Sequence, residues 1–385
     1  MESVNVRDFG ALGDGIKDDK AAIQAALDSG CPAVYIPDGT YRICGTLKIG
    51  SHSHIFAGPS ARLVVSSSFP KRRGDFLISN SDIENGNIDI SIKGGIWDGN
   101  FDGKNNTKDK DLFNPNASSG ATMNFVNVKG LVLQDLTVAN SVTYYIRMCR
   151  IDDFRISGIG FSAKRLAFNQ DGLHFAGGCR NGVVENIRAI TNGETNDDMI
   201  ALNADDSVER IENLDLVCDC IENISFKNIY ADNCYTAIRM LSIRSSIRNI
   251  IFEDVYAGCR TYAINMDAAR YCRTPLFDER EFPEGVGCID NVSIKNLKIY
   301  STNPKSHEPL ICGETLADHF SIENMERLYD KDANPDLPTA KIKNVSGTTV
   351  DYKTDDKLKS IFLNKHNDCI IINDEITSLY INRKK

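Results

Sequence analysis

The sequence predicts an all-β fold, a single-stranded right-handed parallel β-helix in which short strands stack coil upon coil as a solenoid. Three observations predict it. A motif of alternating apolar residues recurs along the chain, only one segment has helical periodicity, and 42% hydrophobic with 25% charged residues is an ordinary globular composition. Because each repeat of a solenoid contacts only its neighbours, we expect one domain over all 385 residues.

The recurring motif has the form Asn-φ-x-φ-x-Asn-φ, where φ is apolar. Its copies begin at Gly130 and Asp153 (weaker) and at Asn181, Asn223, Asn249 and Asn291, which are 23, 28, 42, 26 and 42 residues apart. Alternation turns every second side chain inward, and a polar residue at a fixed offset marks a bend. We expect one coil per copy, with the asparagines in a hydrogen-bonded ladder. The two longer gaps hold either a coil with an inserted loop or nearly two coils.

A β-sandwich is the alternative, since it also has short strands and turns. It does not require the same motif at the same offset, so the repeat favours the solenoid.

Both ends of a solenoid must be covered, because its core and strand edges are otherwise exposed. The only clear helix is expected over 19–29, where apolar residues are spaced for one face. Asp18 or Asp19 is placed to cap it by accepting hydrogen bonds from its free amides. We assign this helix to an N-terminal cap over about 1–45, and fainter strands over 341–381 to the closure of the other end.

Charge and composition exclude several partners. A net charge of −9 disfavours nucleic acid, whose binding needs a basic surface. No run approaches the roughly 18 apolar residues of a membrane span. No basic and apolar leader is visible, so a cytoplasmic location is expected, with secretion after leader removal as the alternative. The twelve cysteines are scattered, which favours buried reduced thiols over a disulfide framework.

Two N-terminal segments carry a family resemblance. Residues 5–25 (Asn-Val-Arg-Asp-Phe-Gly-Ala-Leu-Gly-Asp-Gly onward) and 33–42 (Ala-Val-Tyr-Ile-Pro-Asp-Gly-Thr-Tyr-Arg) resemble the entry segment and first coil of the pectate-lyase-like β-helix superfamily. That superfamily includes polygalacturonases, alginate epimerases and phage tailspikes. The resemblance therefore implies the fold more than the chemistry.

Four motifs in the middle of the chain narrow the resemblance. Gly-Ile-Trp-Asp-Gly at 95–99, an apolar stretch at 131–141, Asn-Gln-Asp-Gly at 169–172 and Asn-Asp-Asp at 196–198 follow in order. This succession resembles glycoside hydrolase family 28, the polygalacturonases and rhamnogalacturonases, over about residues 5–270. It implies hydrolysis of O-glycosidic bonds in a polysaccharide or oligosaccharide that is pectin-like and contains uronic acid.

Two departures from that family concern the substrate. Where the family carries Gly-His-Gly, this chain has Tyr-Thr-Ala-Ile at 235–238. Where the family carries Arg-Ile-Lys, this chain has Arg239-Met240-Leu241, which keeps the arginine and replaces the lysine. We therefore expect a familiar hydrolytic centre that serves an unfamiliar substrate.

Three carboxylates are the predicted catalytic residues. Neighbouring coils lie about 4.8 Å apart, so Asp171 and the Asp197-Asp198 pair, on adjacent coils, place three carboxyls within a few ångströms. Crowding like charges raises the pKa of at least one, which supplies the protonated acid that glycoside hydrolysis needs. The resemblance implies Asp197 as general acid, with Asp171 and Asp198 holding the water and inversion as the outcome. Inverting sites keep acid and base about 6.5–9.5 Å apart.

No cofactor and no metal are expected. A calcium site is the competing functional interpretation of the clustered carboxylates, since hard cations prefer oxygen ligands.

Five further residues are predicted to bind substrate. They are Asn169, His174, Arg239, Tyr262 and Arg270, with Tyr235 as a second aromatic candidate for stacking on a sugar ring. Arg239 can bind a carboxylate in bidentate fashion or neutral hydroxyls, and a structural ion pair is the alternative.

Other notable residues are given structural roles. Asp152-Asp153 and Asp205-Asp206 are predicted to be bends, and Trp97 to pack in the core. Residues 101–119 and 205–218 are predicted insertions that would close a cleft.

Two other function classes fit the same scaffold. A polysaccharide lyase or C5-epimerase abstracts a proton next to a carboxylate and needs a Lys, Arg, Tyr or His base. A tailspike-like glycan-binding protein would bind without turnover.

Overall fold

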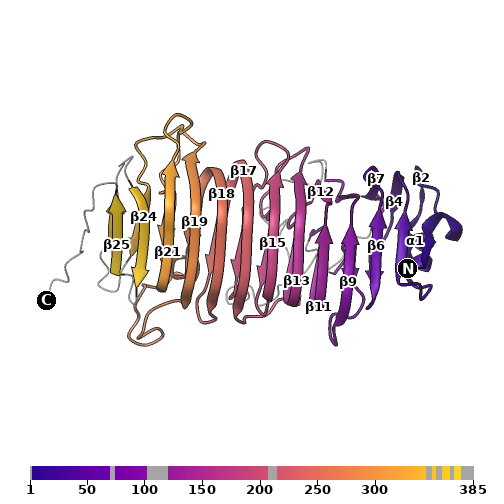
Figure 1. Cartoon of the computed structure of the whole chain (residues 1–385), viewed down its shortest axis with the longest axis horizontal. Coiled ribbons are helices and arrows are strands. Elements are labelled where there is room, and N and C mark those ends of the chain that lie inside the picture. Colours follow the sequence, from indigo (N-terminus) through magenta and orange to yellow (C-terminus); the bar gives the residue numbers. More distant parts are fainter. Residues whose placement is uncertain are drawn as a thin grey trace.

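A computed structural model describes residues 2–69, 74–101, 120–206, 215–343, 349–352, 358–364 and 368–373. It is an all-β structure rich in parallel strands, which lie side by side along one long axis. β1 (Ser3–Asn5) lies toward one end of this stack and β25 (Asp368–Asn373) toward the other (Figure 1).

The elements follow one another in a regular order. The helical elements are η1 (Val6–Phe9), α1 (Lys20–Leu27) and α2 (Ala268–Tyr271). The strands up to residue 139 are β1 (Ser3–Asn5), β2 (Asp14–Asp18), β3 (Ala33–Ile36), β4 (Gly39–Ile43), β5 (Leu47–Ile49), β6 (Ser53–Ala57), β7 (Ala61–Val65), β8 (Ile78–Asn80), β9 (Asn87–Lys93), β10 (Ile96–Asp98), β11 (Met123–Gln134) and β12 (Thr137–Ala139). The later strands are β13 (Ile146–Ser162), β14 (Leu173–Ala176), β15 (Arg180–Ala189), β16 (Asp198–Asn203), β17 (Ile221–Leu241), β18 (Ile247–Met266), β19 (Ile289–Ser301), β20 (Ile311–Gly313), β21 (Ala317–Arg327), β22 (Ala340–Lys343), β23 (Thr349–Tyr352), β24 (Leu358–Asn364) and β25 (Asp368–Asn373).

One column of apolar side chains runs through the interior and carries the core. Each member lies opposite the equivalent residue of the next coil in parallel register: Val34, Ile55, Ile92, Leu133, Ile156, Val184, Phe226, Phe252, Ile294 and Ile322. All ten are fully buried. Each contributes on the order of 1.5–3 kcal/mol on burial. The predicted alternation of inward and outward residues is therefore the pattern that builds the stack.

The strand register also shows whether the two long gaps of the repeat contain one coil or two. Val184 lies opposite Phe226 and Phe252 opposite Ile294, so in both cases the strand 42 positions later is the direct neighbour. Each long gap is thus one coil with inserted residues.

The predicted asparagine ladder is present. Asn223 Nδ2 donates to Asn181 Oδ1 at 3.1 Å, Asn249 to Asn223 at 2.9 Å and Asn291 to Asn249 at 2.8 Å. These asparagines have φ between 51° and 58°, in the left-handed region that asparagine tolerates better than most side chains. The motif thus places asparagine where the backbone bends.

The N-terminal helix lies at one end of the stack, as predicted (Figure 1). It covers 20–27, slightly less than expected, and Asp18 Oδ1 accepts from the Lys20 amide at 3.1 Å. Asp19 does not cap the helix, since its carboxylate accepts instead from the amides of Leu12 and Gly13 at 2.7 and 3.1 Å.

The far end of the stack changes direction. β24 pairs antiparallel with β21, and β25 antiparallel with β24, after a long series of parallel strands. Ile361 and Leu363 of β24 are buried in the main core. These strands therefore close the core at the C-terminal end.

Several smaller predictions are also tested. Trp97 is fully buried and donates from Nε1 to the Gly94 carbonyl at 3.2 Å. The cysteines from Cys31 to Cys312 form no disulfide, but Cys288 is exposed and Cys220 half-buried, so burial holds for only part of the set. None of the described helices is long and apolar enough to cross a membrane. The predicted insertions at 101–119 and 205–218 lie mostly outside the described residues.

Candidate active site

The candidate site lies on one outer face, where four successive coils present aligned residues. The register Leu173 opposite Ile200 extends to Asp171 and Asp198, and the Gly172 amide donates to the Asp198 carbonyl at 2.9 Å. Asp198 in turn lies opposite Thr236 of β17. Motifs that follow one another in the sequence therefore lie on adjacent coils.

Gly172 allows this close approach. A Cβ at this position would lie 2.6 Å from the Met199 carbonyl and 2.7 Å from the Phe161 ring. Both contacts are shorter than carbon atoms tolerate, and one is to backbone. The Asp-Gly pair thus seats Asp171 against the coil that carries Asp198.

The three predicted catalytic carboxyls converge. One oxygen of each of Asp171, Asp197 and Asp198 lies within 4.8 Å of the others. Asp171 and Asp198 are almost fully buried, whereas Asp197 is half-buried. Burial and the adjacent Asp197 charge raise the pKa of Asp198 well above its usual range, although Arg239 opposes the shift. The group therefore holds a proton at a pH where an ordinary aspartate has lost it.

His174 connects this cluster to a further carboxylate. Its Nδ1 lies 2.6 Å from Asp171 Oδ2, and its Nε2 lies 3.5 Å from Asp206 Oδ2. Desolvation lowers the pKa of this buried imidazole, but the hydrogen bonds and charges of the two aspartates outweigh it and raise the pKa overall. Its ring packs on Tyr144 at a centroid distance of 4.2 Å. His174 therefore lies behind Asp171 and is shielded from solvent.

Arg239 is positioned by carboxylates on both sides. Its Nη1 lies 3.7 Å from Asp198 Oδ2, while Nε and Nη2 donate to the two oxygens of Asp267 at 3.3 and 3.4 Å. Only 14% of its side chain is exposed. Its guanidinium fork is thus already engaged by Asp267, which corresponds to the ion-pair alternative for this residue.

Arg270 is the more accessible cation of the site, with 39% of its side chain exposed. Its Nη2 donates to Asp267 Oδ2 and Asn265 Oδ1, both at 3.2 Å, and its Nη1 donates to the Tyr262 hydroxyl. Arg270 and Arg239 therefore both contact Asp267. A ligand carboxylate would therefore reach Arg270 before Arg239.

The two aromatic candidates differ in exposure. Tyr262 lies opposite Thr236 and is only 4% exposed, so little of its ring is free to contact a sugar. Tyr235 is 42% exposed, and its amide donates to the Thr195 carbonyl at 2.8 Å, next to the Asp197 segment. Tyr235 is therefore an accessible aromatic side chain next to the Asp197 segment.

Asn169 lies in the turn before Asp171 with φ of 58° and is half-buried. Its neighbour Gln170 is buried and fixes the turn by donating to the Ser141 carbonyl at 2.7 Å and accepting from the Ala167 amide at 2.6 Å. Asn169 is therefore positioned beside the site by a neighbour with a structural role.

The loop that carries Asp197 is held in place by hydrogen bonds. Arg260 donates to the carbonyl of Gly193 and to Asn196 Oδ1, at 3.1 and 2.6 Å. Glu194, in the same loop, is fully buried and accepts from the Tyr145 hydroxyl at 2.7 Å. Burial raises the pKa of Glu194 to about 7, against the opposing influence of Tyr145 and Arg260.

The predicted bends divide into two kinds. Asp205 is structural, because its Oδ2 accepts from the amides of Ile243, Arg244 and Ser245 at 2.5–2.8 Å. Asp206 is not merely a bend residue, since it is buried against His174.

The sequence reasoning therefore missed Asp206, Asp267 and Tyr144. A signal existed for the two aspartates: each follows shortly after the end of a strand on the face that carries Asp171, Asp197 and Asp198. Tyr144 had no such signal, because tyrosines in this chain mostly pack.

The carboxyl oxygens of Asp171, Asp197 and Asp198 are also close enough to share a cation. Calcium takes six to eight oxygen ligands, so water or further protein oxygens would have to complete such a site. A proton on Asp198 would reduce the charge available to a metal.

Comparison with known proteins shows the family of this chain. The model of the family described as "Rhamnogalacturonase A/epimerase, pectate lyase-like" matches residues 3–260. The chain belongs to this family.

Curated relatives match shorter segments. A mannuronan C5-epimerase of Azotobacter vinelandii is 46% identical over 72 residues, 16% of this chain and 7% of its own length. The plasmin and fibronectin-binding protein A of Streptococcus pneumoniae is 31% identical over 149 residues, 34% of this chain and 21% of its own length. The pre-neck appendage protein of Bacillus phage phi29 is 33% identical over 97 residues, 25% of this chain and 11% of its own length. This chain therefore spans a small part of each relative.

Solved structures share the fold over much more of the chain. The family 28 exopolygalacturonase of Yersinia enterocolitica has a TM-score of 0.56 at 20% identity, with 85% of this chain and 71% of that chain covered. The surface adhesin PfbA of Streptococcus pneumoniae has a TM-score of 0.57 at 15% identity, with 97% of this chain and all of that chain covered. An enzyme and an adhesin thus share this architecture.

Proposed function

We propose that the protein is a glycoside hydrolase of the polygalacturonase type, which cleaves glycosidic bonds of a carboxylated polysaccharide or oligosaccharide. The observation that carries the proposal is the cluster of Asp171, Asp197 and Asp198, whose oxygens lie within 4.8 Å of one another. The raised pKa of Asp198 provides a protonated carboxyl within a group of ionisable ones. A protonated acid beside an ionised carboxylate is what glycoside hydrolysis requires.

The positions of the three aspartates suggest which of them acts as acid and which as base. Asp197 and Asp198 belong to one cluster, and the charge of Asp197 favours the protonated form of Asp198 by raising its pKa. This proton protonates the leaving oxygen, and half-buried Asp197 is the group with access to it. Asp171, paired with His174, is the group that accepts a proton from the attacking water. The buried imidazole thus acts as a positioning group for Asp171.

Inversion is proposed on the strength of the resemblance. The nearest oxygens of the three carboxyls are closer than the 6.5–9.5 Å that usually separates acid and base in inverting enzymes. Following the anomeric configuration of the first product by NMR tests the point, and a product that retains the configuration of the substrate contradicts it. We also propose that the coil is single-stranded and winds to the right, as parallel crossovers nearly always do.

A glycan screen with matched variants tests hydrolysis. Reducing-sugar release is measured on polygalacturonate, rhamnogalacturonan, alginate and neutral plant glycans, with wild type, Asp197→Asn and Asp198→Asn. Loss of a general acid or base costs about 10²–10⁴-fold, so both variants should lose activity on that scale. Asp153→Asn is the control, because Asp153 is an exposed bend residue with φ of 59° that asparagine also adopts.

Two results would refute the hydrolase proposal. One is that the wild type releases no sugar from any glycan in the screen. The other is that Asp197→Asn and Asp198→Asn release as much as the wild type. Activity should also survive treatment with EDTA, since no metal enters the proposed mechanism.

A C5-epimerase or lyase is the second candidate. The arrangement that favours it is the pair of Asp171 and His174, with the His174 ring packed on Tyr144. Such a reaction removes the proton next to a carboxylate, and a lyase leaves an unsaturated product that absorbs in the ultraviolet. Ultraviolet absorbance identifies a lyase, and a changed uronate composition without chain cleavage identifies an epimerase.

A further inference from the structure

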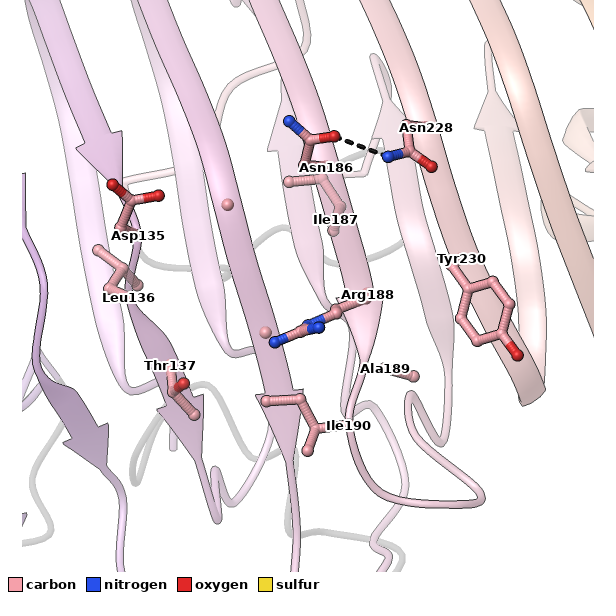
Figure 2. Close-up of a pocket in the computed structure, with 12 residues that line it drawn as sticks. Asp135, Leu136, Thr137, Asn186, Ile187, Arg188, Ala189, Ile190, Asn228 and Tyr230 are labelled. Carbon is pink, nitrogen blue, oxygen red and sulfur yellow. Dashed lines mark hydrogen bonds between the residues drawn. The ribbon is translucent and has the colours of Figure 1, made fainter. Parts of the chain in front are cut away.

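A cavity of the described chain lies on a different outer face from the carboxyl cluster. It has a volume of about 830 Å³ and is bounded by Asp135–Thr137, Gly158, Gly160, Asn186–Ile190, Asn228 and Tyr230 (Figure 2). We call it the side hollow. Four successive coils contribute to it, which is about 14 Å along the axis at the usual strand spacing.

Two glycines create the floor of the side hollow. Gly160 lies opposite Thr137 on one side and Arg188 on the other, so the middle coil has no side chain in this column. A Cβ at Gly160 would lie 2.4 Å from the Ile190 side chain, and one at Gly158 would lie 2.5 Å from the Asp135 carboxylate. The missing side chains leave a recess between the neighbouring coils.

Tyr230 forms one wall and presents a ring face to the recess. Its ring stacks on Tyr256 of the next coil with centroids 4.8 Å apart and planes 9° apart. This stacking fixes the orientation of the Tyr230 ring at the edge of the side hollow, where the broad side of the ring is visible in Figure 2. Tyr230 is 43% exposed. Stacking on one side thus holds a flat apolar face in place on the other.

Arg188 supplies an available positive charge. It is exposed and makes no ion pair with any residue of the described ranges. Its side chain extends toward the Thr137 strand and away from Tyr230, which leaves the ring face uncovered (Figure 2). The one acid of the hollow, Asp135, is 4.0 Å from Lys93 and accepts from Gln134. The recess therefore pairs a free cation with a compensated acid in a chain of net charge −9.

We propose that the side hollow is a second binding site for a carboxylated glycan chain, separate from the catalytic carboxyls. A sugar ring stacks on Tyr230, its carboxylate pairs with Arg188, and its hydroxyls bind Asp135, Thr137 and the Asn186–Asn228 ladder. Aromatic rings offer an apolar face to a sugar, and arginine forms strong charge-assisted hydrogen bonds to carboxylates.

This inference rests on the proposed function for its choice of ligand, the polymer that the enzyme cleaves. The side hollow and the catalytic face belong to the same coils. β15 ends at the hollow and the chain then reaches Asp197, while β17 passes from Tyr230 to Thr236. A polymer held in the hollow would therefore be kept close to the catalytic face.

Affinity electrophoresis of the full chain tests the inference. Mobility is measured in gels with polygalacturonate, alginate or neutral dextran, in an Asp198→Asn background that prevents digestion. Tyr230→Ala and Arg188→Gln should each weaken the apparent affinity for a carboxylated polymer about tenfold, the effect of losing one such contact. Tyr35→Ala is the matched aromatic control, since Tyr35 is also 43% exposed, and Lys305→Gln is the matched charge control on an exposed loop.

Each result of this experiment either supports the second binding site or overturns a part of the proposal. Unchanged mobility of Tyr230→Ala and Arg188→Gln, or no retardation of the parent in any gel, overturns the second site. Equal retardation in dextran overturns the requirement for a carboxylate. In the Asp198-containing protein, both variants should cleave a short oligosaccharide at the wild-type rate. If no glycan is cleaved but both variants lose retention, the hydrolase proposal fails while the binding site stands.

Discussion

Glu194 is a buried carboxyl in the loop that carries Asp197, and its titration should govern stability near neutral pH. In the unfolded chain it ionises near 4.5, whereas in the folded protein burial raises its pKa to about 7. Between these values unfolding releases a proton, so stability falls as pH rises. The groups that face it, Tyr145 and Arg260, favour ionisation but do not offset burial.

Glu194→Gln removes this titration and keeps an acceptor for the Tyr145 hydroxyl. Relative to its value at pH 4.5, the stability of the variant should gain on that of the wild type by up to about 3 kcal/mol as pH rises to 7. Thermal unfolding from pH 4.5 to 8 measures the difference, with exposed Glu84→Gln as the control. A difference between variant and wild type that does not change with pH would contradict the assigned environment.

For single residues, the sequence predicted the charged side chains of the candidate site but not the residues that they contact. Asp171, Asp197 and Asp198 were predictable because they stand in ordered motifs on adjacent coils. The contacts of Arg239 with Asp267 and of His174 with Asp206 join residues 28 and 32 positions apart. Such pairs depend on how each loop leaves its strand, which a periodic pattern does not specify.

At the scale of the element, the bends are the part of the fold that the sequence encodes most directly. Asn223 combines two functions at one bend: φ of 57° and hydrogen bonds to Asn181 and Asn249. Glycine adopts this φ freely, whereas alanine in the left-handed region costs roughly 1–2 kcal/mol. Two substitutions can therefore separate the backbone effect from the side-chain effect.

Asn223→Gly should cost about 1 kcal/mol through the lost ladder hydrogen bonds, and Asn223→Ala about 1–2 kcal/mol more. Urea unfolding followed by circular dichroism measures both, and the difference between them is the backbone contribution. Equal losses for glycine and alanine would show that the left-handed backbone is not what selects asparagine here.

The strand register was predictable because the apolar positions and the asparagines repeat together. The sequence left open whether the gaps of 42 residues held one coil or two, since an insertion and an extra coil have the same length. Direct pairing of Val184 with Phe226 decides for one coil. The inserted residues lack the alternation that would have formed strands of another coil.

At the scale of the whole molecule, the parallel stack depends on its ends. Every inner coil has its strands paired on both sides, whereas a terminal coil would leave one edge and its core open. α1 lies at the N-terminal end and β24 with β25 at the other (Figure 1). The antiparallel pairing of β24 with β21 places Ile361 opposite Ile322, the last residue of the interior column.

Ile361→Asp should therefore open the C-terminal end. A charged side chain has no partner in this apolar position, so β24 should detach and expose the edge of β21 together with Ile322. The expected result is a lower unfolding midpoint together with concentration-dependent oligomers, measured by thermal unfolding and by size-exclusion chromatography with light scattering. Ser360→Asp places the same charge on the adjacent, partly exposed position and should remain as monodisperse as the wild type. If Ile361→Asp were as stable and as monodisperse as Ser360→Asp, β24 would not be the element that closes the stack.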